Sequence, residues 1–600
     1  MSETREFHYR WSWELPAGAE ALWPLVSDTN RFNRDAGLPP VEDARAPGEE
    51  LDNARRRLRI RVKGVLLEWE ELPFEWIRPW RFGVVRRYAR GPLEEMRVLA
   101  DLEPLGPART LLTYRVAARP RGLLGVLTTP LQIGLLSRIT FGRTFRRYAA
   151  EAATPPLELR ALRARPRVAP LARRLEEGGV DGETAALLAG HVVSSDDMTL
   201  TRIRPYELAR LWSRERRTVL VACMRATRLG ILDLSWDILC PSCRGTKDSA
   251  DTLRELRLGI AHCDTCRIDF SPGFDQSVEL TFHPSPAVRR VERSPFCVAG
   301  PQTTPHVVLQ QLLAPGEERT VSVRLEEGRH RLRALGVAGG PSFLVEPGGD
   351  SEVAARLESE GWGDAPLSLS RDATLRLVNA LGHEALVSVE RTGWGDTAAT
   401  AAEVTALPEF RDLFTSEVLA VGAFAQVGSL AILFTDLRDS TALYARVGDP
   451  AAFGRVMRHF QVLGDAVNAS GGTVVKTIGD AVMAVFPTAQ QAVEASLVAQ
   501  ARLATPPLGD EPLTLKAGVH FGPAIAVTLN DRLDYFGTTV NVAARLGALS
   551  SGRDVVLSER VWSEPPVRAL LEARGATVAS SDAPIRGLEG RMAVWRAALP

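Results

Sequence analysis

An apolar run that ends in an aspartate is the feature that most constrains the fold of this chain. Residues 430–436, Leu-Ala-Ile-Leu-Phe-Thr-Asp, have the pattern of a buried strand, and Ser440 and Thr441 then open a predicted helix. A strand that delivers Asp436 to a helix N-terminus places a carboxylate beside free backbone N–H groups. We therefore expect Asp436 to be a metal ligand and expect phosphate groups to bind at Leu437, Ser440 and Thr441.

A strand hairpin supplies a second carboxylate. Residues 473–478 and 481–486 are strand-like runs separated by Gly479 and Asp480, which favour a tight turn. The tip of such a hairpin can aim Asp480 at the metal that Asp436 binds. Each aspartate alone would more simply be a cap or a turn residue, but two at the ends of apolar strands favour a metal site.

The length and composition of the chain indicate several domains. The 600 residues, 45% hydrophobic and 24% charged, exceed one domain of roughly 50–250 residues and have an ordinary globular composition. Lys and Arg number 73, as do Asp and Glu, so no basic excess predicts a nucleic-acid or membrane partner. The N-terminus has no signal-peptide pattern, and Thr, Pro and Gln interrupt the most apolar run, residues 123–139. We expect this run to be a buried or amphipathic helix in a cytoplasmic protein.

The first predicted domain spans residues 1–155. A strand at 7–15, a short helix at 19–26, four further strand-like runs and a long C-terminal helix follow one another. This order, with Trp-Pro-Leu-Val-Ser-Asp at 23–28, resembles the helix-grip fold of the START/polyketide-cyclase-like (SRPBCC) superfamily. Two interpretations remain open: a cavity for a small hydrophobic ligand under the long helix, or a scaffold with a filled core.

Residues 156–235 are predicted to be an Arg- and Pro-rich linker followed by a small helical element. Acidic residues from Glu176 onward follow the arginines at 160–167, and no aromatic residues lie between them. A solvated linker or helix face is therefore favoured over a nucleic-acid patch. Over residues 205–235 two helices lead into a strand, which fits either a winged-helix element or simple helical packing.

Two CxxC pairs lie in the next predicted segment, residues 236–290. Nineteen residues separate the pairs, which is the spacing of a four-cysteine zinc ribbon. A closed four-thiolate site leaves no open coordination position, so the zinc is expected to be structural, with His262 only a neighbour. The predicted zinc ligands are Cys240, Cys243, Cys263 and Cys266.

Residues 291–397 have a β pattern. Apolar and polar residues alternate over 321–325 before a Glu-Glu-Gly turn, which is a hairpin signature. We predict a β-sandwich here. A linker helix over 398–426, interrupted by Pro408, then leads to a C-terminal domain over 427–600.

The C-terminal domain holds two further pairs of polar residues. Lys476 lies in the first hairpin strand, and Asp534 opens the sequence Asp-Tyr-Phe-Gly. Asn541 and Arg545 are four residues apart in an apolar helical context, so they share one helix face. Each pair alone would be weak support for a function. Together with the two strand-end aspartates, in this order and spacing, they resemble the motifs of class III adenylate/guanylate cyclases.

The resemblance implies a ferredoxin-like α/β cyclase domain and assigns a role to each residue. By that resemblance Asp436 and Asp480 bind two Mg²⁺ or Mn²⁺ ions, which lower the pKa of the ribose 3′-hydroxyl and hold the phosphates. Asn541 and Arg545 orient the ribose and stabilise charge on the pentavalent phosphate. In this family these groups meet across a head-to-tail dimer interface. The chain carries both halves, so it is expected to be a homodimer that is inactive as a monomer.

The positions for base recognition predict ATP as the substrate. Lys476 and Asp534 match these positions of the family, and adenine offers an acceptor at N1 and a donor at its 6-amino group. Guanine presents the reverse pattern, and guanylate-type members carry Glu where Lys476 stands. Each mismatched polar pair costs on the order of 1–3 kcal/mol.

We therefore expect a multidomain α+β adenylate cyclase that forms 3′,5′-cyclic AMP and pyrophosphate and is regulated by its N-terminal domains. Asp439 stands where many members have Gly, and Pro523 where many have a polar residue, so turnover is expected to be lowered. The alternative is a weakly active or inactive nucleotide-binding scaffold whose zinc ribbon binds a partner.

Overall fold

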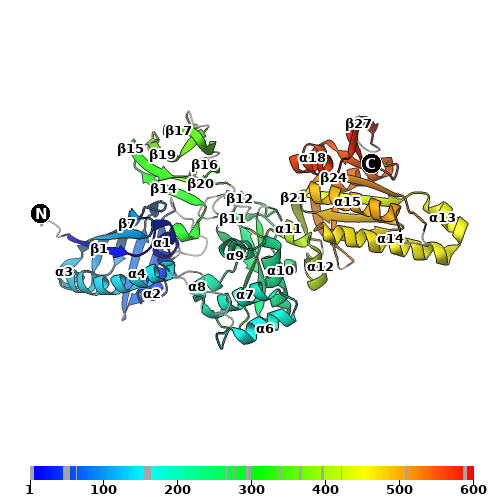
Figure 1. Cartoon of the computed structure of the whole chain (residues 1–600). Helices are drawn as coiled ribbons and strands as arrows, with labels where there is room; N and C mark the ends of the chain where they lie inside the picture. Colours follow the sequence, from blue (N-terminus) through cyan, green and yellow to red (C-terminus); the bar gives the residue numbers. More distant parts are fainter. Residues whose placement is uncertain are drawn as a thin grey trace.

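In the computed structural model the chain forms four units (Figure 1). An N-terminal α/β unit and a C-terminal α/β unit lie at opposite ends, with a central helical unit and a β-rich unit between them. The structure describes residues 6–44, 54–62, 64–153, 164–241, 244–263, 268–275, 277–291, 296–297, 299–337, 340–363, 368–392, 398–420, 422–506, 511–530, 532–585 and 591–600.

The N-terminal unit curves an antiparallel sheet around a long helix, in the element order that the sequence predicts. The strands follow the order β1-β8-β7-β6-β5, and β1 is an edge strand. Phe145 and Tyr148 of the helix are fully buried against the sheet, and a mainly apolar cavity of about 290 Å³ remains beside them. The strands are β1 (Phe7–Leu15), β2 (Glu42–Asp43), β3 (Arg56–Val62), β4 (Val65–Glu71), β5 (Glu75–Ile77), β6 (Arg81–Arg90), β7 (Leu93–Gly106) and β8 (Arg109–Pro120), and the short helices are α1 (Ala19–Val26) and α2 (Thr29–Asp35).

The apolar run at 123–139 is helical as predicted, but it is mostly exposed rather than buried. It lies in α3 (Gly122–Thr129) and the π-helical segment η1 (Pro130–Ser137), which continue into α4 (Arg138–Ala153). Only 11% of its most apolar window is buried, because the sheet contacts the other side of the helix. Within the described part of the chain, this is the single helix that is long and apolar enough to cross a membrane.

The central unit has a compact core where the Arg and Pro content predicted a linker. Val168, Ala172 and Leu175 recur at helical spacing among the arginines, and all three are buried. Five helices pack against a three-stranded sheet of order β10-β9-β13, so the predicted division at residue 235 cuts through one core. The elements are α6 (Ala169–Glu177), α7 (Gly182–Ser194), α8 (Asp197–Leu200), α9 (Pro205–Trp212), α10 (Arg216–Arg228), β9 (Leu232–Leu239), β10 (Thr246–Ala250), β11 (Ala261–Cys263), β12 (Ile268–Phe270) and β13 (Val278–Pro284), with a 3₁₀ turn at Leu253–Glu255.

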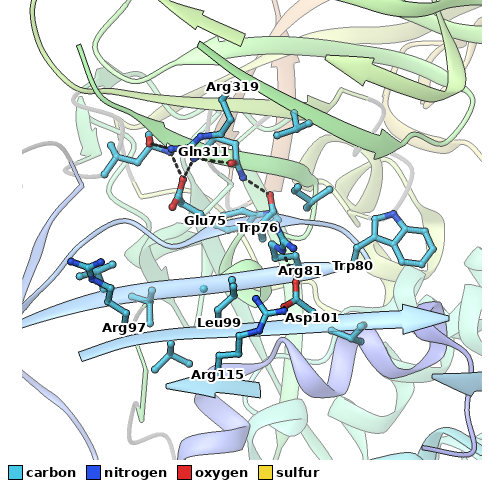
Figure 2. Close-up of a pocket in the computed structure, with 18 of the residues that line it drawn as sticks. Glu75, Trp76, Trp80, Arg81, Arg97, Leu99, Asp101, Arg115, Gln311 and Arg319 are labelled. Atoms are coloured by element: carbon cyan, nitrogen blue, oxygen red, sulfur yellow. Dashed lines mark hydrogen bonds and ion pairs between the residues drawn. The ribbon is translucent and has the colours of Figure 1, made fainter. Parts of the chain in front are cut away.

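The β-rich unit is not a separate sandwich, contrary to the prediction. Strand β14 pairs with β20 on one edge and with β5 of the N-terminal unit on the other, so a single hydrogen-bonded sheet runs through both units. A cleft of about 960 Å³ lies at this junction, where Glu75 and Gln311 contact Arg319 (Figure 2). The elements are β14 (Val307–Leu313), β15 (Glu318–Arg324), β16 (Gly328–Ala334), β17 (Ser342–Glu358), β18 (Gly361–Trp362), β19 (Ser368–Asn379) and β20 (Ala385–Arg391), after a 3₁₀ turn at Pro301–Thr303.

A broken helix joins the central unit to the C-terminal unit. Its halves are α11 (Ala401–Thr405) and α12 (Pro408–Leu413), and Pro408 starts the second half, as predicted. Phe410 packs edge-on against Trp236, with the ring centroids 5.8 Å apart. One apolar core therefore extends from the central helices, through this segment, into the C-terminal sheet.

The C-terminal unit is a sheet of order β22-β23-β21-β24-β26-β28-β27, with β25 paired to β24. Helices α14, α15 and α18 cover one face, and the core shared with the central unit covers part of the other. The elements are β21 (Phe424–Leu437), α13 (Ser440–Val447), α14 (Asp449–Ala469), β22 (Thr473–Ile478), β23 (Ala481–Phe486), α15 (Ala489–Ala504), β24 (Leu515–Leu529), β25 (Arg532–Phe536), α16 (Thr538–Leu549), β26 (Val555–Ser558), α17 (Glu559–Trp562), α18 (Pro565–Ala573), β27 (Thr577–Pro584) and β28 (Arg591–Ala598).

Candidate catalytic site

The two strand-end aspartates lie close together. Asp436 is the penultimate residue of β21, and Asp480 occupies the turn between β22 and β23, where Gly479 takes a φ of 66° that favours glycine. Burial and the neighbouring Asp480 carboxylate raise the pKa of Asp436, and Lys516 partly opposes this rise. Two adjacent carboxylates of this kind are costly without a cation between them.

The donor set fits divalent metal ions. Asp480 Oδ2 is buried and has no hydrogen-bond partner among the described residues. Hard cations such as Mg²⁺ prefer carboxylate oxygens, which Asp436 and Asp480 supply. These two residues would hold the metal, which would supply Lewis-acid stabilisation of the phosphate oxygens.

The loop after Asp436 leads directly into a helix N-terminus. Helix α13 begins at Ser440, and Thr441 is exposed in its first turn, which contains no acidic residue. Asp439 precedes them with a φ of 57° and a ψ of 31°, a left-handed conformation that glycine adopts most readily. This geometry gives a physical reason for Gly at the corresponding position of many cyclases. Oδ2 of Asp439 also lies 3.4 Å from Nε of Arg438, and the positive charge of Arg438 offsets part of the negative charge of Asp439.

Lys476 and Asp534 form an ion pair. Lys476 Nζ lies 2.7 Å from Asp534 Oδ2, although the two residues come from strands β22 and β25. Lys476 Nζ also lies 5.1 Å from the centroid of the Phe536 ring, and Asp534 Oδ1 accepts a hydrogen bond from the Tyr535 backbone at 2.7 Å. The pair thus presents a donor and an acceptor beside an aromatic face.

Helix α16 carries Asn541 and Arg545 on one face. Gly518 of β24 and Gly547 of α16 allow the close approach, since a Cβ on Gly518 would lie 2.0 Å from the Gly547 nitrogen. Asn541 is exposed and Arg545 is half-buried. No ion pair to Arg545 occurs within the described ranges, so its guanidinium is available to an anion.

Two residues near the aspartates were missing from the sequence prediction. Lys516 faces Asp436 across the β21–β24 ladder. In the sequence it is a lone cation between apolar strand residues, and this pattern could have identified it as a site residue. His459 Nε2 lies 3.2 Å from the Asp480 carbonyl oxygen, and burial lowers the pKa of His459 to about 4. The neutral imidazole therefore supports the hairpin tip without adding charge.

Four of the predicted site residues form two pairs. Asp436 and Asp480 form one, and Lys476 and Asp534 form another. Across the described residues, no hydrogen bond or ion pair joins the two groups.

Comparison with known families identifies the C-terminal unit. A family model described as the adenylate and guanylate cyclase catalytic domain matches residues 423–593. Residues 423–593 are a class III nucleotidyl cyclase catalytic domain. A second family model, of unknown function (DUF5939), matches residues 173–297, which cover most of the central unit and extend beyond β13.

Individual proteins are similar to about a quarter of this chain. An adenylate cyclase of Lachancea kluyveri is 31% identical over 159 residues, which are 23% of this chain and 9% of that protein. An adenylate cyclase of Streptomyces coelicolor is 34% identical over 142 residues, 23% of this chain and 34% of that protein. The chain therefore spans well under two thirds of these relatives.

Solved structures are also similar to part of this chain. The catalytic core of a rhodopsin-guanylyl cyclase with converted specificity, in complex with ATPαS, is 21% identical with a TM-score of 0.27 and matches 30% of this chain and 100% of that one. The adenylyl cyclase CyaB from P. aeruginosa is 18% identical with a TM-score of 0.26, over 30% of this chain and 97% of that one.

The zinc prediction falls partly outside the described residues, where Cys243 and Cys266 lie. Cys240 and Cys263 are both fully buried and pack in one small cluster, beside the turn that follows β9 and at the end of β11. His262 pairs with Asp269 at 2.7 Å. In the part of the chain that the structure describes, no group of three or more metal-ligating side chains is assembled.

The repulsion between the two aspartates predicts a stabilising substitution. Because folding raises the pKa of Asp436, the charged pair opposes folding fully above the raised pKa. This opposition weakens as the pH falls through that value and is absent below the usual pKa of an aspartate. Asp480→Asn should therefore raise the melting temperature of the metal-free protein at pH 8 by about 2–4 °C. The difference in melting temperature between variant and wild type should shrink as the pH falls towards about 4. Mg²⁺ should raise the melting temperature of the wild type but not of the variant.

The matched control is Asp582→Asn, which changes an exposed aspartate on β27. It should leave the metal response intact. Equal stability of wild type and Asp480→Asn at every pH, together with an equal response to Mg²⁺, would contradict the paired-carboxylate site.

Proposed function

We propose that the protein is an adenylate cyclase. The ribose O3′ of ATP attacks the α-phosphorus, the bond to the β-phosphate oxygen breaks, pyrophosphate leaves, and the proton of the hydroxyl passes to water. The observation that carries the choice of ATP is the Lys476–Asp534 pair beside Phe536. When adenine binds, its hydrogen bonds replace the bond between Lys476 and Asp534. Lys476 then donates to N1, and Asp534 accepts from the 6-amino group.

Guanine would meet the opposite polarity at both positions. Its N1 is a donor and would face the Lys476 ammonium, while its O6 is an acceptor and would face the Asp534 carboxylate. Each mismatch leaves a partly buried polar group unpaired. The preference for ATP over GTP therefore follows from the cost of leaving these groups desolvated without a partner, as much as from their attraction to adenine.

The remaining groups act on the triphosphate. Asp436 and Asp480 hold the metal, and the free N–H groups at the start of α13, near Ser440 and Thr441, bind phosphate oxygens. Arg545 neutralises charge on the α-phosphate, and its position on a packed helix keeps the guanidinium pre-oriented.

The two half-sites meet between two copies of the chain. The metal-binding aspartates of one copy act with the base-recognition and α16 residues of the other, which is consistent with the lack of direct bonds between the two groups. Phe424, Ile525 and Phe536 are exposed near Asp534 and supply an apolar surface for such a dimer.

Regulation passes through the shared core. Arg411 of α12 donates to the Leu533 carbonyl at 3.2 Å and lies over the Tyr535 ring, and Thr405 lies 3.2 Å from the Tyr535 hydroxyl. Both contacts flank Asp534 on β25. A shift of the central unit would thus move a base-recognition residue in this cytoplasmic enzyme. A small hydrophobic ligand in the N-terminal cavity is the proposed source of such a shift.

A substrate assay tests the base assignment. With Mn²⁺, the full chain should form cyclic AMP from ATP, and GTP should be a poorer substrate. Lys476→Glu should lower kcat/KM for ATP by roughly 10- to 100-fold, which follows from about 1–3 kcal/mol for the lost polar match. Arg502→Glu, at an exposed position on α15, is the charge-reversal control. Equal turnover of ATP and GTP would refute the assignment, and binding of ATP without turnover of either nucleotide would favour a scaffold.

Mixing inactive variants tests the dimer. Asp436→Ala and Arg545→Ala should each lower activity by about 100-fold or more. Equimolar mixing should restore about a quarter of wild-type activity, since half of the dimers are mixed and each has one complete site of two. Asp436→Ala mixed with Asp480→Ala provides the control, because their heterodimers contain no complete site. No recovery in the first mixture would contradict a composite site.

We also propose a structural zinc ion bound by Cys240, Cys243, Cys263 and Cys266. Purified protein should contain about one zinc per chain by elemental analysis, and Cys240→Ser should lose it and melt at a lower temperature. Cys223→Ser is the control, since Cys223 is a buried, solitary cysteine whose pKa burial raises to about 12. Full zinc retention in Cys240→Ser would exclude this ligand set.

A further inference from the structure

The outer face of the long N-terminal helix is an exposed apolar row. Seven of the twenty large apolar side chains that are exposed among the described residues lie on it, and Leu123 and Leu127 are 84% and 76% exposed. A soluble surface rarely gathers leucines in this way without covering them. The row consists of Leu123, Leu124, Leu127, Leu131, Leu135 and Ile139, and a seventh residue, Leu136, also lines the apolar cavity.

The inner face of the same helix is fixed to the protein. Phe141 packs against Trp11, and Phe145 against Trp13, with ring centroids 6.1 and 5.3 Å apart. Gly142 allows close contact, since a Cβ there would lie 2.9 Å from Trp13 Nε1. The helix therefore lies flat on the unit and offers only its outer face to a partner.

An arginine cleft continues the apolar row. It lies between edge strand β1 and the helix, has a volume of about 790 Å³, and is lined by Arg10, Arg138, Arg143 and Arg146 together with Leu135 and Ile139 of the row. None of these four arginines forms an ion pair within the described parts of the chain. No acidic residue lines the cleft.

The cleft at the β5–β14 junction shows that unpaired arginines are not a general property of this chain. There Arg81 and Arg115 share Asp101, at 2.6 and 3.0 Å, and Arg319 contacts Glu75 (Figure 2). Its charges neutralise one another inside the fold. The arginines beside β1 are exposed and have no such internal partner, so their charges are available to an external anion.

We propose that this surface docks on an anionic lipid bilayer, with the leucine row in the acyl region and the arginines on the headgroup phosphates. Amphipathic helices of this kind bind in the membrane interface through apolar burial and basic charge together. A second copy fits the surface poorly, because a two-fold contact would bring eight arginines together without carboxylates. The helix lies at the end of the molecule farthest from the cyclase domain, so docking leaves that domain free (Figure 1).

Vesicle co-sedimentation of the full chain tests the proposal, which does not depend on the proposed cyclase activity. The protein should bind phosphatidylcholine vesicles with 30% phosphatidylglycerol at least 10-fold more tightly than pure phosphatidylcholine vesicles. Leu123→Asn with Leu127→Asn should weaken binding at least 10-fold, because apolar burial is lost. Arg143→Gln with Arg146→Gln should weaken binding to anionic vesicles by about 25-fold, from roughly fivefold per basic residue.

Two control variants distinguish binding through this surface from non-specific binding to vesicles. Leu211→Asn and Arg228→Gln change an isolated exposed leucine and an exposed arginine of the central unit, and both should bind as the wild type does. Each leucine and arginine variant should keep the wild-type melting temperature, since these side chains are exposed.

Four results would overturn the proposal. They are equal binding by both double variants and the wild type, loss of self-association rather than of vesicle binding in the leucine variant, and resistance to alkaline carbonate extraction, which would indicate a spanning helix. The fourth is phosphate binding that needs the arginines while vesicle binding does not, which would identify a free anion site.

Discussion

One apolar core holds the central unit and the cyclase domain of this molecule together. Its residues come from the central helices, from α11 and α12, and from the face of the C-terminal sheet that includes Tyr535. Burial of this kind stabilises a junction at roughly 25 cal/mol for each Å² of apolar surface removed from water. Because Asp534 neighbours Tyr535 on β25, the packing of the central unit bears directly on the strand that carries the Lys476–Asp534 pair, and the proposed regulation rests on this contact.

The cyclase domain holds its charges in two different ways. Lys476 and Asp534 satisfy each other, so in the proposed function base recognition exchanges one set of hydrogen bonds for another. Asp436 and Asp480 repel each other, and burial strengthens that repulsion. The Lys476–Asp534 pair is therefore satisfied without a ligand, whereas the Asp436–Asp480 pair is stabilised by a cation. The proposed metal–nucleotide substrate would engage both pairs.

Charge is balanced over the whole chain but not locally. Equal totals of acidic and basic residues argue against an anionic partner, yet the surface beside β1 collects arginines without acidic neighbours. Elsewhere the same residue type is neutralised inside the fold, as where Arg202 and Arg204 reach the buried Glu279 at 2.8 and 2.7 Å. Net charge therefore gives little information about the partners of a multidomain protein.

The sequence by itself determined the local chemistry of the C-terminal domain. The short apolar run at residues 430–436 favours a buried strand, and Gly479-Asp480 between two such runs favours a turn, so these elements were predictable from residues close together in the chain. The tertiary structure decided what depends on distant residues: the contact between Lys476 and Asp534, the core formed by Val168 and Leu175 where a linker was predicted, and the joining of β14 to β5 in place of a sandwich. It also decided which side of the helix at 122–153 faces the sheet. Periodicity shows that a helix has an apolar side, but only the packing of all the units shows whether that side is covered.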